Sequence, residues 1–216
     1  VKWLFGKEFE LPLEWEIRSL GDIISVLGDY HSNGSYEKLR KNTTILTKEN
    51  FAIMIRTTNF EQNDFSKDLR FVDENAYNYL SKSKVKPFDI IMNKIANAGS
   101  MYLMPKLDKP ITLGMNLFLI RIKNHDQKFI YNFLKENEKY IKLFTQGAVT
   151  KTITKDNVRK LPIVLPPLSE QQQIASILSN IDTQIGKEKL HKSNLEQLKK
   201  GLMQKLLTGQ IRVKVK

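Results

Sequence analysis

Residues 147–174 read Gly-Ala-Val-Thr-Lys-Thr-Ile-Thr-Lys-Asp-Asn-Val-Arg-Lys-Leu-Pro-Ile-Val-Leu-Pro-Pro-Leu-Ser-Glu-Gln-Gln-Gln-Ile, and this stretch decides the fold. A polar loop rich in Thr and Lys leads into a short predicted strand at Leu161–Leu165. The two prolines that follow end the strand, because proline has no N–H to donate to a sheet. Ser169 and Gln172 then have the spacing of a capping box, which predicts a helix with Ser169 as its N-cap. A globular domain is therefore expected to end here, where a long helix begins.

The long helix is expected to carry one apolar stripe. After Ser169, Ile and Leu recur at intervals of three or four residues, which is the spacing of one helix face. The stripe consists of Ile174, Ile177, Leu178, Ile181, Ile185, Leu195, Leu198, Leu202 and Leu206. A helix of about 38 residues would be roughly 57 Å long, a length that suits a second helix packed alongside in a coiled coil. A helix folded back over its own domain is the alternative.

Apolar runs alternate with turn signals in the earlier part of the chain. The predicted strands are Phe51–Arg56, Phe88–Ala96 with its hairpin partner Met101–Met104, and Met115–Ile122. The predicted helices are Asp73–Ser83 and Phe129–Leu143. The fold class is therefore α+β, in which a globular domain with a curved, mostly antiparallel or mixed sheet and flanking helices precedes a long C-terminal coiled-coil-like helix. We predict a domain at residues 1–168, a helix at 169–208 and a tail at 209–216.

Composition limits the class of partner and of site. The 216 residues carry a formal net charge of +12, which favours a polyanion such as DNA or RNA; a general excess of lysine is the alternative source of that charge. The chain has no cysteine, and its three histidines lack metal-ligand spacing, so no metal site is predicted. No apolar run approaches the ~18 residues that cross a bilayer. We therefore expect no membrane contact and a cytoplasmic protein.

No set of residues predicts catalysis. A base methyltransferase needs a glycine-rich cofactor turn and an Asn/Asp-Pro-Pro-Tyr/Phe tetrad, whereas the Pro-Pro pair here lies between Leu165 and Leu168. The sequence also lacks the Gly-x-x-x-x-Gly-Lys-Ser/Thr phosphate loop of ATP-driven motors. Acidic residues such as Asp64 and Asp68 are scattered along a charged stretch and are interpreted as solvated surface. No catalytic residue and no cofactor are therefore predicted for this chain.

Three segments resemble the DNA-specificity (S) subunits of type I restriction-modification systems. Pro-Pro-Leu-Ser-Glu-Gln-Gln-Gln-Ile-Ala at 166–175 resembles the end of a target-recognition domain and the start of its spacer helix. Leu-Pro-Leu-Glu-Trp-Glu-Ile-Arg-Ser-Leu-Gly-Asp-Ile at 11–23 resembles the start of such a domain, and residues 202–213 resemble the end of the spacer helix. Residues 28–146 carry few of the family's recurring motifs, as expected where each member reads its own DNA sequence.

The resemblance implies one target-recognition domain plus one spacer helix, which is half of the usual tandem S subunit. Such a half would bind double-stranded DNA, recognise one half-site of a bipartite target, and dock methyltransferase (M) subunits and, through them, restriction (R) subunits. S-adenosylmethionine, ATP and Mg²⁺ would act in those partners. The chain would form a homodimer through its C-terminal helix, or be a fragment of a longer chain. The alternatives are the specificity domain of a fused restriction-methylation enzyme and a stand-alone DNA-binding protein.

Residues that read DNA are expected in loop tips that carry amides, hydroxyls and cations, because Asn and Gln suit adenine edges and Arg and Lys suit guanine. Four loops have this composition: His31–Tyr36, Arg56–Asn59, Lys94–Ser100 and Gln146–Thr152. The last of them lies in the segment that resembles the family. The candidate residues are Gln146, Thr150, Lys151, Thr152, Lys94, Asn97, Ser100, Arg56, Thr57, Asn59, Asn33 and Tyr36. An ordinary solvated loop tip is the alternative for each.

Overall fold

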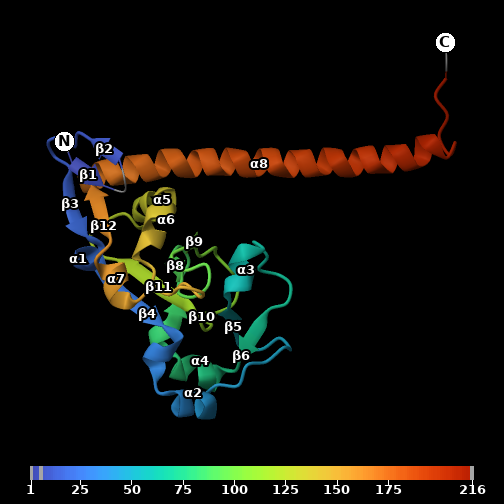
Figure 1. The fold of residues 1–216 in the computed structure, drawn as a ribbon. Helices are drawn as coiled ribbons and strands as arrows, with labels where there is room; N and C mark the ends of the chain where they lie inside the picture. Colours follow the sequence, from blue (N-terminus) through green and yellow to red (C-terminus); the bar gives the residue numbers. More distant parts are fainter. Residues whose placement is uncertain (1, 5–6, 215–216) are drawn as a thin grey trace. The chain divides into compact units, whose positions relative to one another are not determined.

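The structure, a computed structural model, describes residues 2–4 and 7–214. It divides into two compact units, with the boundary between Gln172 and Gln173. The first unit contains strands and short helices, and the second contains most of helix α8 (Leu168–Leu207) and the tail (Figure 1). The predicted α+β class with a long C-terminal helix is thus confirmed. Across the described ranges, every helix is too short or too polar to cross a membrane.

Two four-stranded sheets form the frame of the first unit (Figure 1). The first is antiparallel and has the order β4 (Ile24–Asp29), β11 (Leu117–Ile122), β8 (Ile90–Asn93) and β9 (Met101–Leu103). The second has the order β6 (Arg70–Val72), β5 (Ala52–Ile55), β10 (Ile111–Leu113) and β7 (Lys84–Val85). This second sheet is mixed, because β5 and β10 run parallel. The predicted hairpin is confirmed as β8 and β9.

Short helices connect and cover these strands. They are α1 (Leu20–Ile23), α2 (Tyr36–Asn42), α3 (Thr57–Glu61), α4 (Glu74–Tyr79), α5 (Gln127–Glu136), α6 (Glu138–Ile141) and α7 (Lys155–Arg159). Three 3₁₀ turns accompany them, at η1 (Tyr30–Asn33), η2 (Ser81–Ser83) and η3 (Lys142–Phe144). Near the N-terminus, β1 (Lys2–Leu4) pairs antiparallel with β2 (Lys7–Phe9).

Strand β5 explains why the two sheets share a core. Its four residues are all buried, and alternate side chains of a strand point to opposite faces. Ile53 and Ile55 pack in a cluster that includes Ile91 and Leu119 of the other sheet. The other two residues of β5 pack in a second cluster, which includes residues of α2 and α4. A continuous apolar run is therefore required here, and it is the feature that made this strand predictable.

Residues from the two ends of the first unit pair with each other. Strand β3 (Glu16–Ser19) is antiparallel to β12 (Pro162–Leu165), and the Leu20 N–H donates to the Leu161 carbonyl over 2.7 Å. The Trp15 indole N–H donates to the Glu170 carboxylate over 3.0 Å. The chain segments that lead into and out of the first unit are therefore joined (Figure 1).

Helix α8 begins at Leu168, so the prediction of Ser169 as N-cap is wrong. The Pro167 carbonyl accepts from the N–H groups of Glu170 and Gln171, both over 3.0 Å. Proline has a φ close to the helical value, and the prolines therefore prepare the helix start one residue early. Gln171 is the buried polar side chain of this turn, and it is 0% exposed. Its side chain accepts from the Asp126 N–H and donates to the Pro166 carbonyl.

The predicted helix Phe129–Leu143 is interrupted at Asn137, between α5 and α6. The Asn137 side-chain amide donates to the Phe133 carbonyl over 2.8 Å, a local bond of the kind by which Asn competes with regular helix hydrogen bonding. Leu143, expected on the apolar face, is 77% exposed. The prediction of one continuous amphipathic helix is therefore wrong, and the interruption places Glu138 next to Ser100.

Replacing Gln171 with Ala should destabilise the first unit by about 1–3 kcal/mol, because the Asp126 N–H and the Pro166 carbonyl would lose their buried partner. Gln172→Ala is the matched control, since Gln172 is the neighbouring residue of the same type and is exposed. Urea unfolding measures both free energies of unfolding. Equal values for the two variants would contradict this role of Gln171.

Candidate nucleic-acid interface

Two of the predicted loops form one surface. Lys94–Ser100 follows β8, and Gln146–Thr152 precedes α7; isolated bridges join Ile95 to Thr152 and Gln146 to Thr152. The Ala96 N–H donates to the Lys151 carbonyl over 2.9 Å. These are main-chain bonds, so they fix the two loops together whatever side chains they carry. The pairing brings together residues that lie about fifty positions apart in the sequence.

The tip of the second loop needs a glycine. Gly147 has φ of +103°, and a Cβ on it would lie 2.3 Å from the Thr150 carbonyl oxygen. The turn exposes its side chains, and Val149 is 97% exposed. Within the described ranges, the exposed side chains of Gln146, Thr150 and Lys151 make no hydrogen bond or ion pair. Their amide, hydroxyl and ammonium groups are available to a ligand.

An ion cluster holds both loops from one side. The Asp29 carboxylate accepts from Lys94 over 3.1 Å and from Lys155 over 3.0 Å, and it also accepts from the Ser32 hydroxyl. Burial would raise the pKa of Asp29, but the hydrogen bonds from Ser32, Lys155 and Lys94 outweigh burial and lower it to about 2. Asp29 therefore stays charged. Its ion pairs link Lys94, at the start of the first loop, to Lys155, which follows the second loop.

Glu138 holds the first loop from another side. Its carboxylate accepts from the Ser100 hydroxyl over 2.7 Å and pairs with Lys135 and Lys142. Burial would raise the pKa of Glu138, but the bonds from Lys135 and Ser100 prevail and lower it. Lys142 also donates to the Asn97 side chain over 3.1 Å. The loop at Lys94–Ser100 is thus fixed at both of its ends.

Several candidate residues use their polar groups inside the protein. Asn59 and Ser100 are each 2% exposed, and the side-chain amide oxygen Oδ1 of Asn59 accepts from the Arg56 main-chain N–H. The Asn33 amide bonds to the Tyr30 carbonyl, the Ser83 hydroxyl and the Lys82 N–H. Arg56 pairs with Asp68, and Thr57 donates to Asn93.

The exposed candidate residues for DNA contact lie in two places. Tyr36 is 74% exposed at the start of α2, away from the paired loops. Gln146, Thr150, Lys151 and Asn97 belong to the paired loops themselves. The candidate residues did not include Asp29, Glu138 and Lys155, which position these loops. An acidic residue at the end of an apolar strand was the available signal for Asp29.

Residues 12–198 match the profile of the family described as type I restriction modification DNA specificity domain. The match covers most of the chain, and the chain therefore belongs to this family.

Two Methanocaldococcus jannaschii proteins are similar. One is named for the specificity subunit of the type I restriction enzyme MjaX; it is 30% identical over 213 residues, covering 95% of this chain and 45% of its own length. The other, the type I restriction enzyme MjaVIII specificity subunit, is 28% identical over 208 residues, covering 92% and 43%. The chain thus spans a little less than half the length of these relatives.

Solved structures show the same fold. A type I restriction-modification system S subunit from M. genitalium has a TM-score of 0.58 at 17% identity, covering 91% of this chain and 47% of that one. A structure described in terms of complex assembly and conformational transition of the type I R-M system has a TM-score of 0.61 at 18% identity, covering 91% and 46%. This chain thus shares its fold with these two solved structures.

The Asp29 cluster should be visible in acid unfolding. Because the folded-state pKa of about 2 lies below the ordinary 3.8, the stabilisation is complete above about pH 4 and is lost as the pH falls toward 2. The shift corresponds to about 2 kcal/mol. Asp29→Asn should therefore be less stable than the wild type at neutral pH, and the difference should shrink below pH 4.

The control for this measurement is Asp108→Asn, which removes an exposed carboxylate. Urea unfolding from pH 2 to 7 gives the free energy of unfolding of all three proteins. A difference between Asp29→Asn and the wild type that is constant over this range would rule out the charged cluster as its source.

Proposed function

We propose that this chain reads one half-site of a bipartite DNA target for a type I restriction-modification complex. The observation that carries the proposal is the joined surface of the loops at 94–100 and 146–152. It combines a fixed main chain with exposed amide, hydroxyl and ammonium groups at Gln146, Thr150 and Lys151. These are the groups that hydrogen-bond to base edges and phosphates. Of the candidate residues, we assign base contact to these three and to Asn97.

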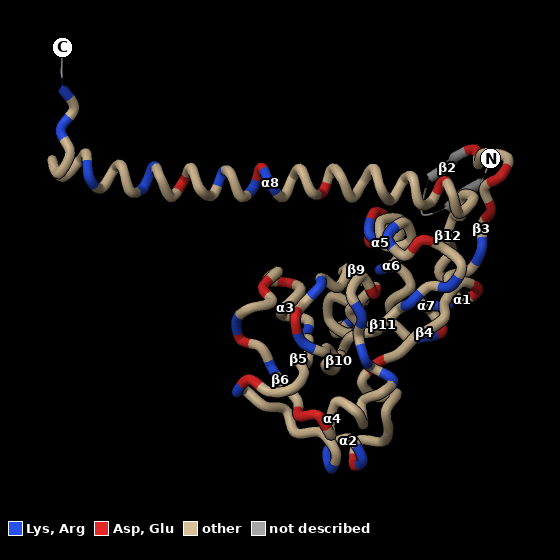
Figure 2. Tube along the Cα trace, turned by 180° about the vertical axis from the view of Figure 1, so that it is seen from behind, with Lys and Arg blue, Asp and Glu red and all other residues tan. Residues whose placement is uncertain are grey.

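The protein's charge supports the same partner. The net charge of +12 favours association with a polyanion, and Figure 2 shows Lys and Arg interspersed with Asp and Glu in both units. The chain would bind duplex DNA through the phosphates and would distinguish one DNA sequence from another through contacts to the bases.

The chemistry of the complex would belong to other subunits. M subunits, with S-adenosylmethionine, would methylate the DNA that this chain has recognised, and R subunits, with ATP and Mg²⁺, would cleave unmodified DNA. The role proposed for this chain is recognition and docking in the cytoplasm, without catalysis of its own.

Methylation tests this role directly. The purified chain should transfer no methyl group from S-adenosylmethionine to duplex DNA, and adding the M subunit should produce methylation at one defined sequence. Gly147→Ala should abolish that methylation while still binding the M subunit, because a Cβ at residue 147 breaks the loop turn without touching the core. Methyl transfer by the chain alone, or an unchanged methylation pattern with Gly147→Ala, would contradict the proposal.

We further propose that α8 pairs with the α8 of a second copy. Ile174, Ile181, Leu195 and Leu202 are separated by seven or fourteen residues, which is the heptad spacing of a coiled coil. Eight side chains of the stripe are between 37% and 59% exposed, namely Ile177, Leu178, Ile181, Ile185, Leu195, Leu198, Leu202 and Leu206. An apolar stripe of this length is costly in water, and a two-fold pairing would cover it and present two recognition units.

The double variant Ile181→Glu/Leu195→Glu should weaken this dimer by roughly a hundredfold or more, since each buried aliphatic side chain contributes about 1.5–3 kcal/mol. The control is Thr183→Glu/Ser193→Glu, which adds the same charge on the opposite side of the helix. Sedimentation equilibrium should find the control dimeric and the first variant monomeric. A wild-type chain that is monomeric at tens of micromolar would refute the pairing.

A further inference from the structure

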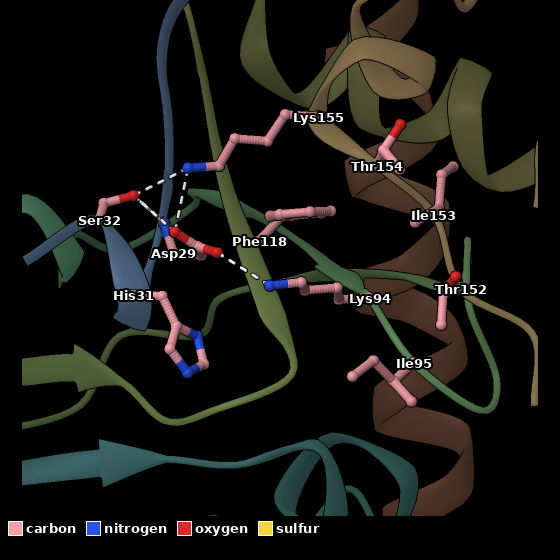
Figure 3. Close-up of a pocket in the computed structure, with 10 residues that line it drawn as sticks. All are labelled: Asp29, His31, Ser32, Lys94, Ile95, Phe118, Thr152, Ile153, Thr154 and Lys155. Atoms are coloured by element: carbon pink, nitrogen blue, oxygen red, sulfur yellow. Dashed lines mark hydrogen bonds and ion pairs between the residues drawn. The ribbon is translucent and has the colours of Figure 1, made fainter. Parts of the chain in front are cut away.

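A pocket of about 580 Å³ lies where three segments of the first unit meet (Figure 3). Asp29 and Ser32 come from the end of β4 and from η1, Lys94 follows β8, and Thr152 and Lys155 flank the start of α7. Figure 3 shows both lysine side chains extending toward the Asp29 carboxylate. The pocket therefore adjoins the two paired loops and shares Lys94, Ile95 and Thr152 with them.

The lysines, rather than the carboxylate, are presented to a ligand. The Asp29 side chain is 8% exposed, whereas those of Lys94 and Lys155 are 27% and 31% exposed. Both carboxylate oxygens are occupied, one by Lys94 and the other by Lys155 and Ser32. Two cations and one anion give the cluster a formal charge of +1, so it attracts an anion.

Unused hydrogen-bond donors remain in the pocket. A lysine ammonium has three N–H donors. Lys94 directs one of them to Asp29, and Lys155 directs one to Asp29 and one to Ser32. The Thr152 hydroxyl also lines the pocket, and no hydrogen bond to it occurs within the described ranges. A group with several acceptor oxygens and no donor complements this lining. The adenine and cytosine edges present donors, for which the carboxylate is already occupied, and the guanine edge presents only two acceptors, fewer than a phosphate group.

We infer that this pocket binds a single phosphate group of the DNA backbone and thereby sets the register of the duplex against the loops at 94–100 and 146–152. The inference rests on the proposed function and adds to it a specific contact that carries no sequence information. Phosphate contacts fix the position of a protein on the duplex, and base contacts then discriminate. Asp29 acts as a positioning residue, because its ion pairs hold two flexible lysine side chains in place before DNA arrives.

The main-chain pairing explains why one phosphate can align two loops. Ile153 N–H donates to the Lys94 carbonyl over 3.0 Å, so the residues that carry or adjoin the two cations are joined directly. A duplex phosphate held between Lys94 and Lys155 lies at the base of both loops. If this phosphate were displaced, both loops would shift together relative to the duplex, rather than one loop relative to the other.

A charge series on this cluster tests the inference with a duplex of arbitrary sequence. Lys155→Gln reduces the formal charge of the cluster from +1 to 0, and Asp29→Asn raises it to +2. Lys41→Gln is the control, since it removes one exposed cation from α2, which does not line the pocket. Fluorescence anisotropy gives the dissociation constant of each protein between 50 and 200 mM salt.

Loss of one phosphate contact should reduce the slope of log K against log salt by about 0.9. We expect this reduction for Lys155→Gln and for Lys94→Gln, and no change for Lys41→Gln. Asp29→Asn should bind the arbitrary duplex several-fold more tightly than the wild type, even though its melting temperature falls, because the added unit of positive charge outweighs the lost positioning of the two lysines. A merely structural cluster would instead make all three pocket variants bind more weakly, in proportion to their loss of melting temperature.

The other outcomes separate the two proposals. A wild-type chain that binds no duplex would overturn both the proposed function and the phosphate pocket. A wild-type chain that binds, together with an unchanged slope for Lys155→Gln, would overturn the pocket alone. Inorganic phosphate, added at constant ionic strength, identifies the source of the anion. Saturation of the pocket at low millimolar phosphate without any effect on duplex binding would assign it to free phosphate and refute the DNA contact.

Discussion

The antiparallel pairing of β3 with β12 joins the two ends of the first unit, and the loops carried between those ends depend on it. Four residue pairs, from Ser19 with Pro162 to Glu16 with Leu165, close the unit across nearly its whole sequence. Trp15 and Glu170 extend the closure by a side-chain bond into the first turn of α8. The family-like segments at 11–23 and 166–175 thus contact each other, and these contacts close the first unit.

This closure permits the middle of the chain to vary. The core of β5, β8 and β11 needs apolar residues of a suitable size. The loops at 94–100 and 146–152 are instead fixed mainly by main-chain bonds and by two carboxylates, the buried Asp29 and the partly buried Glu138. Apart from Gly147, the exposed side chains at their tips can therefore change without loss of the loop conformation. A scaffold that fixes the loop main chain independently of most loop side chains suits the role in DNA recognition proposed for this chain.

Much of this architecture could be predicted from the sequence. Strands β5, β8 and β11 are buried, and their apolar runs stand between clear turn signals. The helix stripe after Ser169 was equally plain. Strand β10 could not be found in this way, because three residues show no periodicity and the strand exists through its pairing with β5 and β7. The break at Asn137 depends on one side-chain bond that competes with the helix.

The candidate site could be predicted only in part. Loop composition selected the two loops that the structure pairs, but it could not separate Ser100 and Asn59, which are used inside the protein, from Gln146 and Thr150, which are exposed. The difference depends on partners far along the chain, such as Glu138 for Ser100. Asp29 and Lys155 were not predicted for the same reason, because their ion pair joins residues that only the fold brings together.

We propose a division of labour, in which the first unit reads bases and α8 sets the distance between two half-sites. Inserting seven residues at His191 would lengthen the helix by about 10.5 Å, which is about three base pairs, and would preserve the heptad stripe. The measurement is methylome sequencing of a host that carries this variant with its M subunit. The account predicts unchanged half-sites separated by a gap about three base pairs longer. Altered half-site bases, or an unaltered gap, would contradict it.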